Sequence, residues 1–390
     1  MSGIGRDFAR VVRGLRDREF PWTAATTYLN NASIGPLPER TRLALEAFNA
    51  RRTAPHLLPE RELTALQADA RAAAAALIGA TADEIALVPN TSVGLNVAAR
   101  ALPLAAGETV LVSDREFPAN VYPWLALRER GVTVELAPVT AAGWPDEERL
   151  LERLRDPRVR VLAVSHVQFS TGYRADLDRL SAACRANGAY IVVDAIQGLG
   201  HCPLDVRDTP VDVLATGGQK WLLSPWGSGF VYVRRDLIET MTPAHVGWMS
   251  FEGTDDFTHL TDYADRLRAD ARRFEVGTVA TQDVMAMTTS LGLLAELGVE
   301  AIGAWTLALG DPLLAWAERR CVRVVSPRYA VHRCGIVCLA PDDARQAHRK
   351  LKAAGVVCAF REVAIRLSPH AFNTADEMEK VVEVLDGVVS

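Results

Sequence analysis

The chain has 390 residues, of which 49% are hydrophobic and 23% charged, and its formal net charge is −5 at pH 7. These values are typical of a globular protein with a large core, and the length favours two domains over one. They exclude a strongly basic surface for nucleic acid, and no apolar run in the sequence reaches the length of a membrane span.

The first 20 residues carry charges throughout and lack the apolar segment of a secretory signal. We therefore expect a cytoplasmic protein. The six cysteines are scattered without a paired framework, which predicts free thiols in that compartment. We expect residues 1–20 to pack beside the C-terminal part of the chain.

From about residue 60 to 235, helical patterns alternate with short apolar runs rich in β-branched residues. This alternation predicts an α/β fold with a mostly parallel, seven-stranded type of sheet and helices on both faces. The predicted large domain covers residues 21–265. Its expected strands are 84–89, 109–114, 132–138, 159–167, 189–195, 211–218 and 227–233. Its expected helices are 65–80, 92–102, 120–131, 146–156 and 176–188.

After about residue 265 the pattern changes, which predicts a smaller α+β domain over residues 266–390. A helical pattern over 284–320 leads into short strands, and an amphipathic helix closes the chain; these later elements are 322–327, 335–340, 364–369 and 374–389. Cys334 and Cys338 have no second pair of cysteine or histidine at metal-binding spacing. They are interpreted as buried strand residues, so no metal site is expected.

Lys220 is the only lysine in the first 349 residues of a chain with four lysines and 39 arginines. Guanidinium stays charged, whereas an ammonium can lose its proton and attack a carbonyl, so this isolated lysine suggests a nucleophilic amine. It follows two glycines, which let the backbone approach a ligand closely.

Three other strand ends carry distinctive groups, and ligands of such sheets bind at the carboxyl ends of strands. Thr91 and Ser92 open a helix and suit a phosphate, with a simple helix cap as the alternative. Asp194 ends an apolar strand as a helix cap or as the partner of a buried cation. Phe117 follows a strand end and would present an aromatic face, or would only pack in the core. Together with Lys220 these groups suit pyridoxal 5′-phosphate (PLP).

Eight motifs carry a resemblance to a known family over about residues 28–374: YLNNASIGPLP, PNTSVGLN, REFPAN, VSHVQFSTG, VVDAIQGLG, GGQKWLLSPWGSGF, FEVGT and IRLSPHAFNT. In this order they resemble the class V aminotransferases among fold-type I PLP-dependent enzymes. That group includes cysteine desulfurases, kynureninases and isopenicillin N epimerases. The resemblance implies a fold-type I PLP-dependent transferase fold.

The resemblance also assigns roles around the cofactor ring. Lys220 would form the Schiff base and act as the catalytic acid and base, and Asp194 would pair with the pyridine nitrogen. Gln197 would contact the phenolic oxygen, and Phe117 would stack on the ring.

Further roles implied by the resemblance concern the phosphate and the substrate. Thr91, Ser92 and Gln219 would hold the phosphate, and Thr278 would reach the phosphate of a neighbouring subunit, which implies a homodimer with shared sites. Arg366 would clamp the substrate carboxylate, a bidentate task suited to guanidinium. Asn120 and His166 would line the substrate pocket.

The resulting hypothesis is an enzyme that acts at the α-carbon of an amino acid through an external aldimine. Transamination, racemisation and β-elimination share the same Cα carbanion, and the aminotransferase or isopenicillin N epimerase-like branch is favoured. A cysteine desulfurase or C–S lyase is an alternative, with Cys358 as its possible thiol; core packing is the other interpretation of Cys358. A non-catalytic scaffold that keeps the fold is the third.

Overall fold

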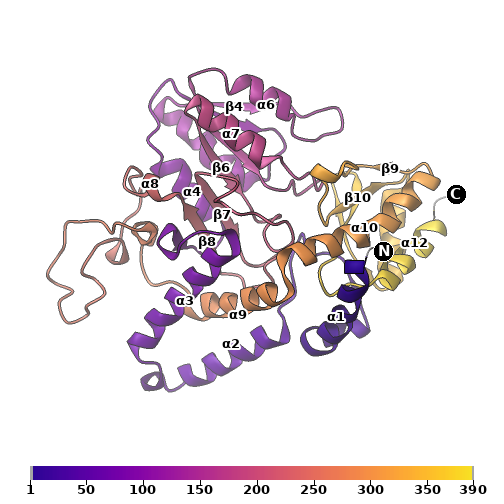
Figure 1. Ribbon diagram of the computed structural model, residues 1–390, viewed down its shortest axis with the longest axis horizontal. Helices are drawn as coiled ribbons and strands as arrows, with labels where there is room; N and C mark the ends of the chain where they lie inside the picture. The colour runs from indigo at the N-terminus through magenta and orange to yellow at the C-terminus, as the bar shows by residue number, and fades with distance from the viewer. Residues whose placement is uncertain (1–2, 389–390) are drawn as a thin grey trace.

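The protein is described by a computed structural model over residues 3–388, and a seven-stranded sheet forms its centre (Figure 1). The strand order is β2-β8-β7-β6-β5-β3-β4. All neighbours are parallel except that β8 runs antiparallel to β2 and β7. The strands are β2 Ile85–Leu87, β3 Thr109–Ser113, β4 Thr133–Ala137, β5 Val159–Ser165, β6 Tyr190–Asp194, β7 Val213–Gly217 and β8 Gly229–Val233. The predicted α/β fold with a mostly parallel sheet is confirmed.

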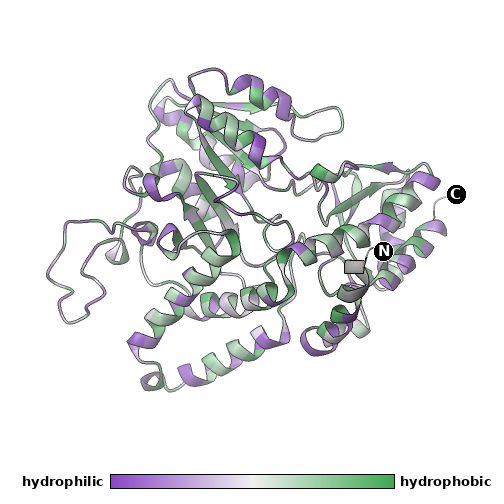
Figure 2. Cartoon of the chain, in the orientation of Figure 1, coloured by the Kyte–Doolittle hydropathy of each residue, from purple (hydrophilic) through white to green (hydrophobic). Residues whose placement is uncertain are grey.

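Helices cover both faces of this sheet, because successive strand residues point to opposite sides. In β5, Leu162 and Val164 join one core cluster, while Val161 and Ala163 join another. The first cluster packs under α3 Glu60–Ile78, α6 Glu147–Arg153, α7 Leu177–Asn187 and α9 Thr281–Leu297. The second packs under α4 Thr91–Ala101, α5 Tyr122–Leu125 and α8 Arg235–Ile238. Apolar residues concentrate in the strands and polar residues on the outer helices, among them α2 Glu39–Arg52 (Figure 2).

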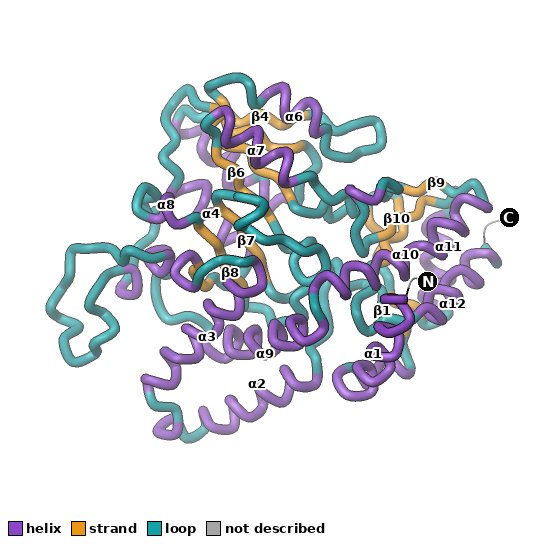
Figure 3. Tube along the Cα trace, viewed as in Figure 1, coloured by secondary structure: helices purple, strands orange, loops and turns teal. Residues whose placement is uncertain are grey.

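A second, antiparallel sheet lies beside the first, with helices packed on it (Figure 3). Its order is β12-β13-β10-β9. The elements are β9 Arg323–Val324, β10 Val337–Ala340, β12 Ala359–Arg361, β13 Ala364–Leu367, α10 Val299–Arg319, α11 Ala344–Ala353 and α12 Ala375–Asp386. Cys334 and Cys338 are buried here, and their thiols donate to the carbonyls of Gly172 and Ser170.

The N-terminal part of the chain lies against this smaller sheet and its helices. Arg16 of α1, Gly3–Glu19, donates to the Glu377 carboxylate at 3.0 Å and to the Phe372 carbonyl at 2.8 Å. Strand β1, Thr27–Tyr28, pairs in parallel with β11, Val356–Val357. Residues 1–2 of the predicted N-terminal segment lie outside the described residues, and the three-part division of the chain stays a prediction.

Two predicted helices differ from the structure for local reasons. The pattern over 284–320 forms α9 and α10, which meet at an angle of 75° where Gly298 adopts φ 78°. The pattern over 120–131 gives only α5 between two 3₁₀ turns, since Pro118 and Pro123 lack the N–H that a regular helix needs.

No single helix among residues 3–388 is both long enough and apolar enough to span a membrane. Only α9 and α10 taken as a bent pair meet both conditions.

Candidate active site

The carboxyl ends of β5, β6 and β7 lie next to one another at one edge of the large sheet. Ser165 pairs in register with Asp194, and Asp194 pairs with Ala215. Lys220 follows the end of β7 by three residues. The parallel register therefore brings the predicted lysine and carboxylate together.

Asp194 and Lys220 alter each other's protonation inside the fold. Asp194 is 2% exposed, and its carboxylate accepts the backbone N–H of Ile196 at 3.1 Å. Burial raises the pKa of Asp194 to about 6, opposed by that hydrogen bond and by the charge of Lys220. Burial lowers the pKa of Lys220 to about 8; Asp194 opposes this shift, and the charges of Arg366 and Arg361 add to it. Near neutral pH a usable fraction of Lys220 is a neutral, nucleophilic amine.

An aromatic wall stands beside the lysine. The Nζ atom of Lys220 lies 5.6 Å from the centroid of the Phe117 ring. Phe117 is 44% exposed and meets Phe169 edge-on, with 5.3 Å between ring centroids. Phe169 was not predicted as a site residue. The exposed face of Phe117 can stack on a flat ring near Lys220.

The start of α4 forms a small cradle with the loop before Lys220. Asn90 is the helix cap, since its side chain accepts the N–H of Val93 at 3.0 Å. The Thr91 hydroxyl is buried without a hydrogen-bond partner. A Cβ on Gly217 would lie 3.4 Å from this hydroxyl oxygen and 2.5 Å from Gln219 Oε1. A Cβ at residue 217 would therefore narrow the cradle and displace the Gln219 side chain.

The same cradle offers unused backbone donors. The N–H groups of Thr91 and Ser92 belong to the first turn of α4 and have no acceptor within the helix. Ser92 is exposed at the rim, and its carbonyl accepts the side chain of Asn96 at 2.9 Å. Free amides and a free hydroxyl at a helix N-terminus suit a phosphate.

Gln197 links the floor of the site to its surroundings. Its Oε1 atom accepts the indole N–H of Trp221 at 2.9 Å, and its Nε2 atom donates to the carbonyl of Ala32 at 2.9 Å. One N–H of the amide stays available, because the group carries two. The predicted contact of Gln197 with a phenolic oxygen would use that second hydrogen.

Residues 30–35 form a further wall of the site. The N–H of Gly35 donates to the Gln219 carbonyl at 2.9 Å, and a Cβ on Gly35 would lie 2.0 Å from the Lys220 carbonyl oxygen. At the other end of the segment, the N–H of Ala32 donates to the Ser368 hydroxyl at 3.0 Å. The segment thus joins the lysine loop to the end of β13.

Arg366 of β13 closes the site from the smaller sheet. It is 2% exposed. Its guanidinium donates to the Phe169 carbonyl and to the Ser33 hydroxyl, each at 2.7 Å, and its Nε atom is buried without a partner. Burial lowers the pKa of Arg366 to about 10. A buried guanidinium with a donor to spare suits the predicted carboxylate.

Glu116 is a buried carboxylate that the sequence interpretation missed. It accepts the Ser165 N–H at 2.8 Å, the Ser165 hydroxyl, and the Gln168 side chain at 2.7 Å. Burial raises the pKa of Glu116 to about 7; the Ser165 hydrogen bonds oppose this shift and the charge of Asp194 adds to it. Its neighbours in sequence, Arg115 and Phe117, gave no sign that the side chain would be buried.

The remaining predicted residues occupy different surroundings. Asn120 is fully buried, and its Oδ1 atom accepts the Trp124 indole N–H at 3.3 Å. The His166 ring lies against Gly198, where an added Cβ would be 2.1 Å from its Nδ1 atom, and burial lowers the pKa of His166 to about 3. It shares no described hydrogen bond or ring contact with Lys220. The pocket roles of Asn120 and His166 stay predictions.

Thr278 is exposed on this chain and lines a cavity of about 290 Å³ together with Pro89 and Val93. This cavity does not include Lys220. The predicted reach of Thr278 to a neighbouring subunit stays a prediction.

These residues fit a flat ring that bears a phosphate and an aldehyde. The cradle at Thr91 and Gly217 offers unpaired donors, Phe117 offers an aromatic face, and Asp194 can pair with a protonated ring nitrogen. The amine of Lys220 lies 5.6 Å from the centroid of the Phe117 ring and interacts with the charge of Asp194.

Comparisons with known proteins identify the family. The sequence profile described as aminotransferase class-V matches residues 27–377. The uncharacterized aminotransferase YcbU of Bacillus subtilis is 32% identical over 79% of this chain and 80% of its own length. An isopenicillin N epimerase of Amycolatopsis lactamdurans is 34% identical over 63% of this chain and 64% of its own. A probable cysteine desulfurase of Methanothermobacter thermautotrophicus is 27% identical over 95% and 96%.

Solved structures share the fold at lower identity. The apo cysteine desulfurase of Thermococcus onnurineus NA1 superposes with a TM-score of 0.85, at 21% identity, over 97% of this chain and 98% of that one. The cystine C–S lyase C-DES superposes with a TM-score of 0.84, at 23% identity, over 94% and 99%.

Proposed function

The chain belongs to the aminotransferase class-V family and is a PLP-dependent enzyme, and from this premise we propose that it acts at the α-carbon of an amino acid. When bound, PLP supplies an electron sink for negative charge at that carbon. The observation that carries the proposal is the position of Lys220, whose amine lies 5.6 Å from the Phe117 ring and shares the sheet edge with buried Asp194.

Lys220 moves the substrate proton in this proposal. Because burial brings the pKa of Lys220 to about 8, its Nζ atom can accept a proton from Cα and return it within the same site. Transamination, racemisation and β-elimination all begin with removal of that proton.

The other residues bind and orient the cofactor and the substrate. Thr91 and the first turn of α4 hold the phosphate, and Phe117 sets the plane of the ring. Asp194 keeps a proton on the ring nitrogen through charge pairing. Arg366 binds the α-carboxylate with its unpaired Nε–H and orients the Cα–H bond toward Lys220.

Two measurements test this function. Borohydride reduction followed by peptide mass spectrometry should find the cofactor adduct on Lys220, and not in a Lys220→Ala variant. Mass spectrometry of products from an amino-acid panel should then report amine transfer, inversion or elimination. A wild-type enzyme that yields no adduct at residue 220 would overturn the proposal.

Within the family we favour an aminotransferase or isopenicillin N epimerase-like reaction over a persulfide-forming desulfurase. Only Glu362 and Val363 separate β12 from β13, so this hairpin has no room for a long loop. Cys358 lies just before β12 and packs against the core, and burial raises the pKa of its thiol to about 12. A thiol in this setting is a poor nucleophile.

Replacing Cys358 with serine separates the alternatives. Turnover of the preferred substrate should stay within about twofold of the wild type if Cys358 only packs. Loss of sulfur release from cysteine, with folding intact, would instead favour a desulfurase that uses this thiol. A C–S lyase needs no such thiol and would appear as β-elimination products in the amino-acid panel. The retention of Lys220, Asp194 and Arg366 does not favour a non-catalytic scaffold.

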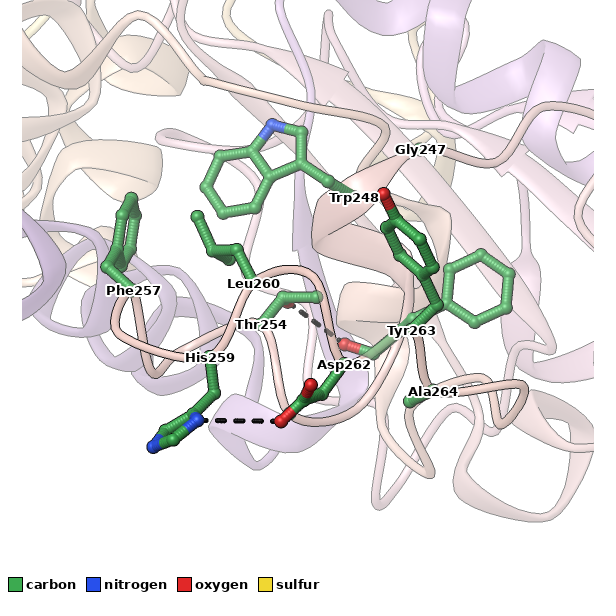
Figure 4. Close-up of a pocket in the computed structure, with 11 residues that line it drawn as sticks. Gly247, Trp248, Thr254, Phe257, His259, Leu260, Asp262, Tyr263 and Ala264 are labelled. Atoms are coloured by element: carbon green, nitrogen blue, oxygen red, sulfur yellow. Dashed lines mark hydrogen bonds and ion pairs between the residues drawn. The ribbon is translucent and has the colours of Figure 1, made fainter.

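We also infer a homodimer that works in the cytoplasm. The loop around residues 247–264 stands away from the body of the protein (Figure 1) and carries exposed Trp248, Phe257 and Tyr263. These side chains line a pocket of about 570 Å³ (Figure 4). Apolar surface of this kind is typical of a surface that another chain covers. All six cysteines are free, which fits a reducing compartment.

A further inference from the structure

A second arginine stands beside Arg366 on the same face of the β12–β13 hairpin. In this hairpin Ala359 is paired with Arg366, and Arg361 with Ala364. Side chains two residues apart on a strand share a face, so Arg361 and Arg366 are diagonal neighbours. The small side chains of Ala359 and Ala364 lie between them.

Both guanidinium groups converge on one hydroxyl. The Nη2 atom of Arg366 donates to Ser33 Oγ at 2.7 Å, and the Nη2 atom of Arg361 donates to the same oxygen at 3.3 Å. Ser33 lies two residues before Gly35, which contacts the Lys220 loop. The two positive charges therefore border the site of Lys220, and both lower its pKa.

No acidic side chain that the structure describes forms an ion pair with either arginine. Among the described residues, Arg361 otherwise donates only to the Phe360 carbonyl, at 3.0 Å. By contrast, Arg71, which is buried as Arg366 is, donates to both carboxylate oxygens of Glu275, at 3.0 and 2.6 Å. The pair at Ser33 thus carries two charges that the described side chains leave uncompensated.

The guanidinium groups of Arg361 and Arg366 differ in solvent exposure. Arg366 is 2% exposed and retains a buried, unpartnered Nε–H, whereas Arg361 is exposed at the end of the hairpin. A single carboxylate is satisfied by one guanidinium in a bidentate pair. The inner arginine suffices for an α-carboxylate, and the outer one faces whatever extends toward solvent.

We propose that Arg361 and Arg366 together select an amino acid with a second carboxylate on its side chain. Arg366 binds the α-carboxylate and Arg361 binds the side-chain carboxylate. Ser33 holds the two guanidinium groups in place. This inference rests on the proposed function and names its substrate class.

Binding of non-reactive acids to the holoenzyme tests the pair without turnover. Isothermal titration calorimetry would compare glutarate, with two carboxylates, against valerate, with one on a chain of equal length. Glutarate should bind about tenfold more tightly than valerate. Arg361→Gln should lower the affinity for glutarate by about tenfold and leave the affinity for valerate unchanged. Arg366→Gln should lower the affinity for both acids.

A matched control removes one positive charge nearby without touching Ser33. Arg345 lies over the Phe360 ring, 4.7 Å from its centroid, so Arg345→Gln should change neither affinity by more than about twofold. Equal binding of the two acids by the wild type, or equal weakening of both by Arg361→Gln, would overturn the inference.

Kinetics give a second readout that separates this inference from the proposed function. The ratio of KM for glutamine to KM for glutamate should fall by about tenfold in Arg361→Gln. If the enzyme turned over amino acids without preferring acidic ones, the inference about Arg361 and Arg366 would be wrong and the proposed function would stand. Absence of turnover with every amino acid, alongside tight glutarate binding that Arg361→Gln weakens, would overturn the proposed function and leave the two arginines as a binding site for dicarboxylates.

Discussion

Burial shifts the pKa values of the side chains around Lys220 more than direct ion pairs do. Asp194, Glu116 and Lys220 all have a shifted pKa in which burial is the largest cause. In each case the shift favours the neutral form, which is what a low-dielectric site does to an isolated charge. Protonation at this site is therefore sensitive to any group that enters it.

Asp194→Asn tests the charge-pairing role. An amide cannot stabilise a protonated ring nitrogen as a carboxylate does, so kcat should fall by at least about a hundredfold. Fluorescence or absorbance titration should show that the cofactor still binds, because the phosphate cradle at Thr91 is intact. Unchanged kcat would contradict the assignment of Asp194.

Glu116 predicts a pH-dependent stability. Its pKa is raised from 4.5 to about 7 in the folded protein, so the folded state prefers the protonated form. The contribution of Glu116 to the free energy of unfolding is complete below pH 4.5 and is lost above pH 7. Between these values it declines by on the order of 1.4 kcal/mol per pH unit at most.

The Glu116→Gln variant cannot ionise at this position. Its free energy of unfolding relative to the wild type, from urea titrations at pH 5, 6, 7 and 8, should therefore rise with pH and level off above 7. Curves of constant separation across this range would contradict the raised pKa of Glu116.

At the scale of elements, the strands were predictable and some helices were not. The seven strands of the large sheet are recognisable as apolar, β-branched runs, because both of their faces are buried. Helix α11 was missed, since it buries only Ala344, Ala347 and Leu351 among ten residues and its polar sequence resembles a loop. The break between α9 and α10 depends on the backbone of Gly298, which periodicity does not report.

The site was predictable only in part, for a similar reason. Asp194 ends β6, while Lys220 follows β7 and Phe117 follows β3. The parallel register of these strands places the three residues at one edge of the sheet. Ser33 and Arg361 are 328 residues apart, and only the tertiary fold joins them. No local pattern could have reported that contact.

Two glycines in different elements allow a matched test of backbone contact. A Cβ on Gly35 would lie 2.0 Å from the Lys220 carbonyl oxygen, whereas a Cβ on Gly292 of α9 would meet no heavy atom within 4 Å. Gly35→Ala should destabilise the protein by about 1–3 kcal/mol and weaken cofactor binding. Gly292→Ala should stabilise it by about 0.5–1 kcal/mol, since alanine is the better helix former.

Chemical unfolding of the two variants checks this pair, with cofactor affinity as the second readout. The expected signs of the two changes are opposite. If Gly35→Ala proved as harmless as Gly292→Ala, the close packing of residues 30–35 on the lysine loop would be refuted.

At the scale of the whole molecule, the exposed loop around residues 247–264 predicts the oligomeric state. Trp248, Phe257 and Tyr263 are 43%, 46% and 87% exposed on the single chain. The triple substitution Trp248→Ser, Phe257→Ser and Tyr263→Ser should weaken the proposed homodimer, because it removes apolar area from the interface.

Light scattering coupled to size-exclusion chromatography measures this effect. The wild type should elute as a dimer of the 42.4 kDa chain and the variant as a monomer at micromolar concentration. Substituting exposed Val363, which lies on the β12–β13 turn outside this loop, is the control and should leave the dimer intact. A wild type that elutes as a monomer would contradict the inference.

The wall formed by residues 30–35 also has a consequence for biosynthesis. The hydrogen-bond partner of this stretch, Ser368, is translated more than 330 residues after it. A nascent chain that has finished the large sheet still lacks the group that fixes the wall beside Lys220. Chains truncated before Ser368 should therefore emerge with a folded sheet but an unfinished catalytic centre.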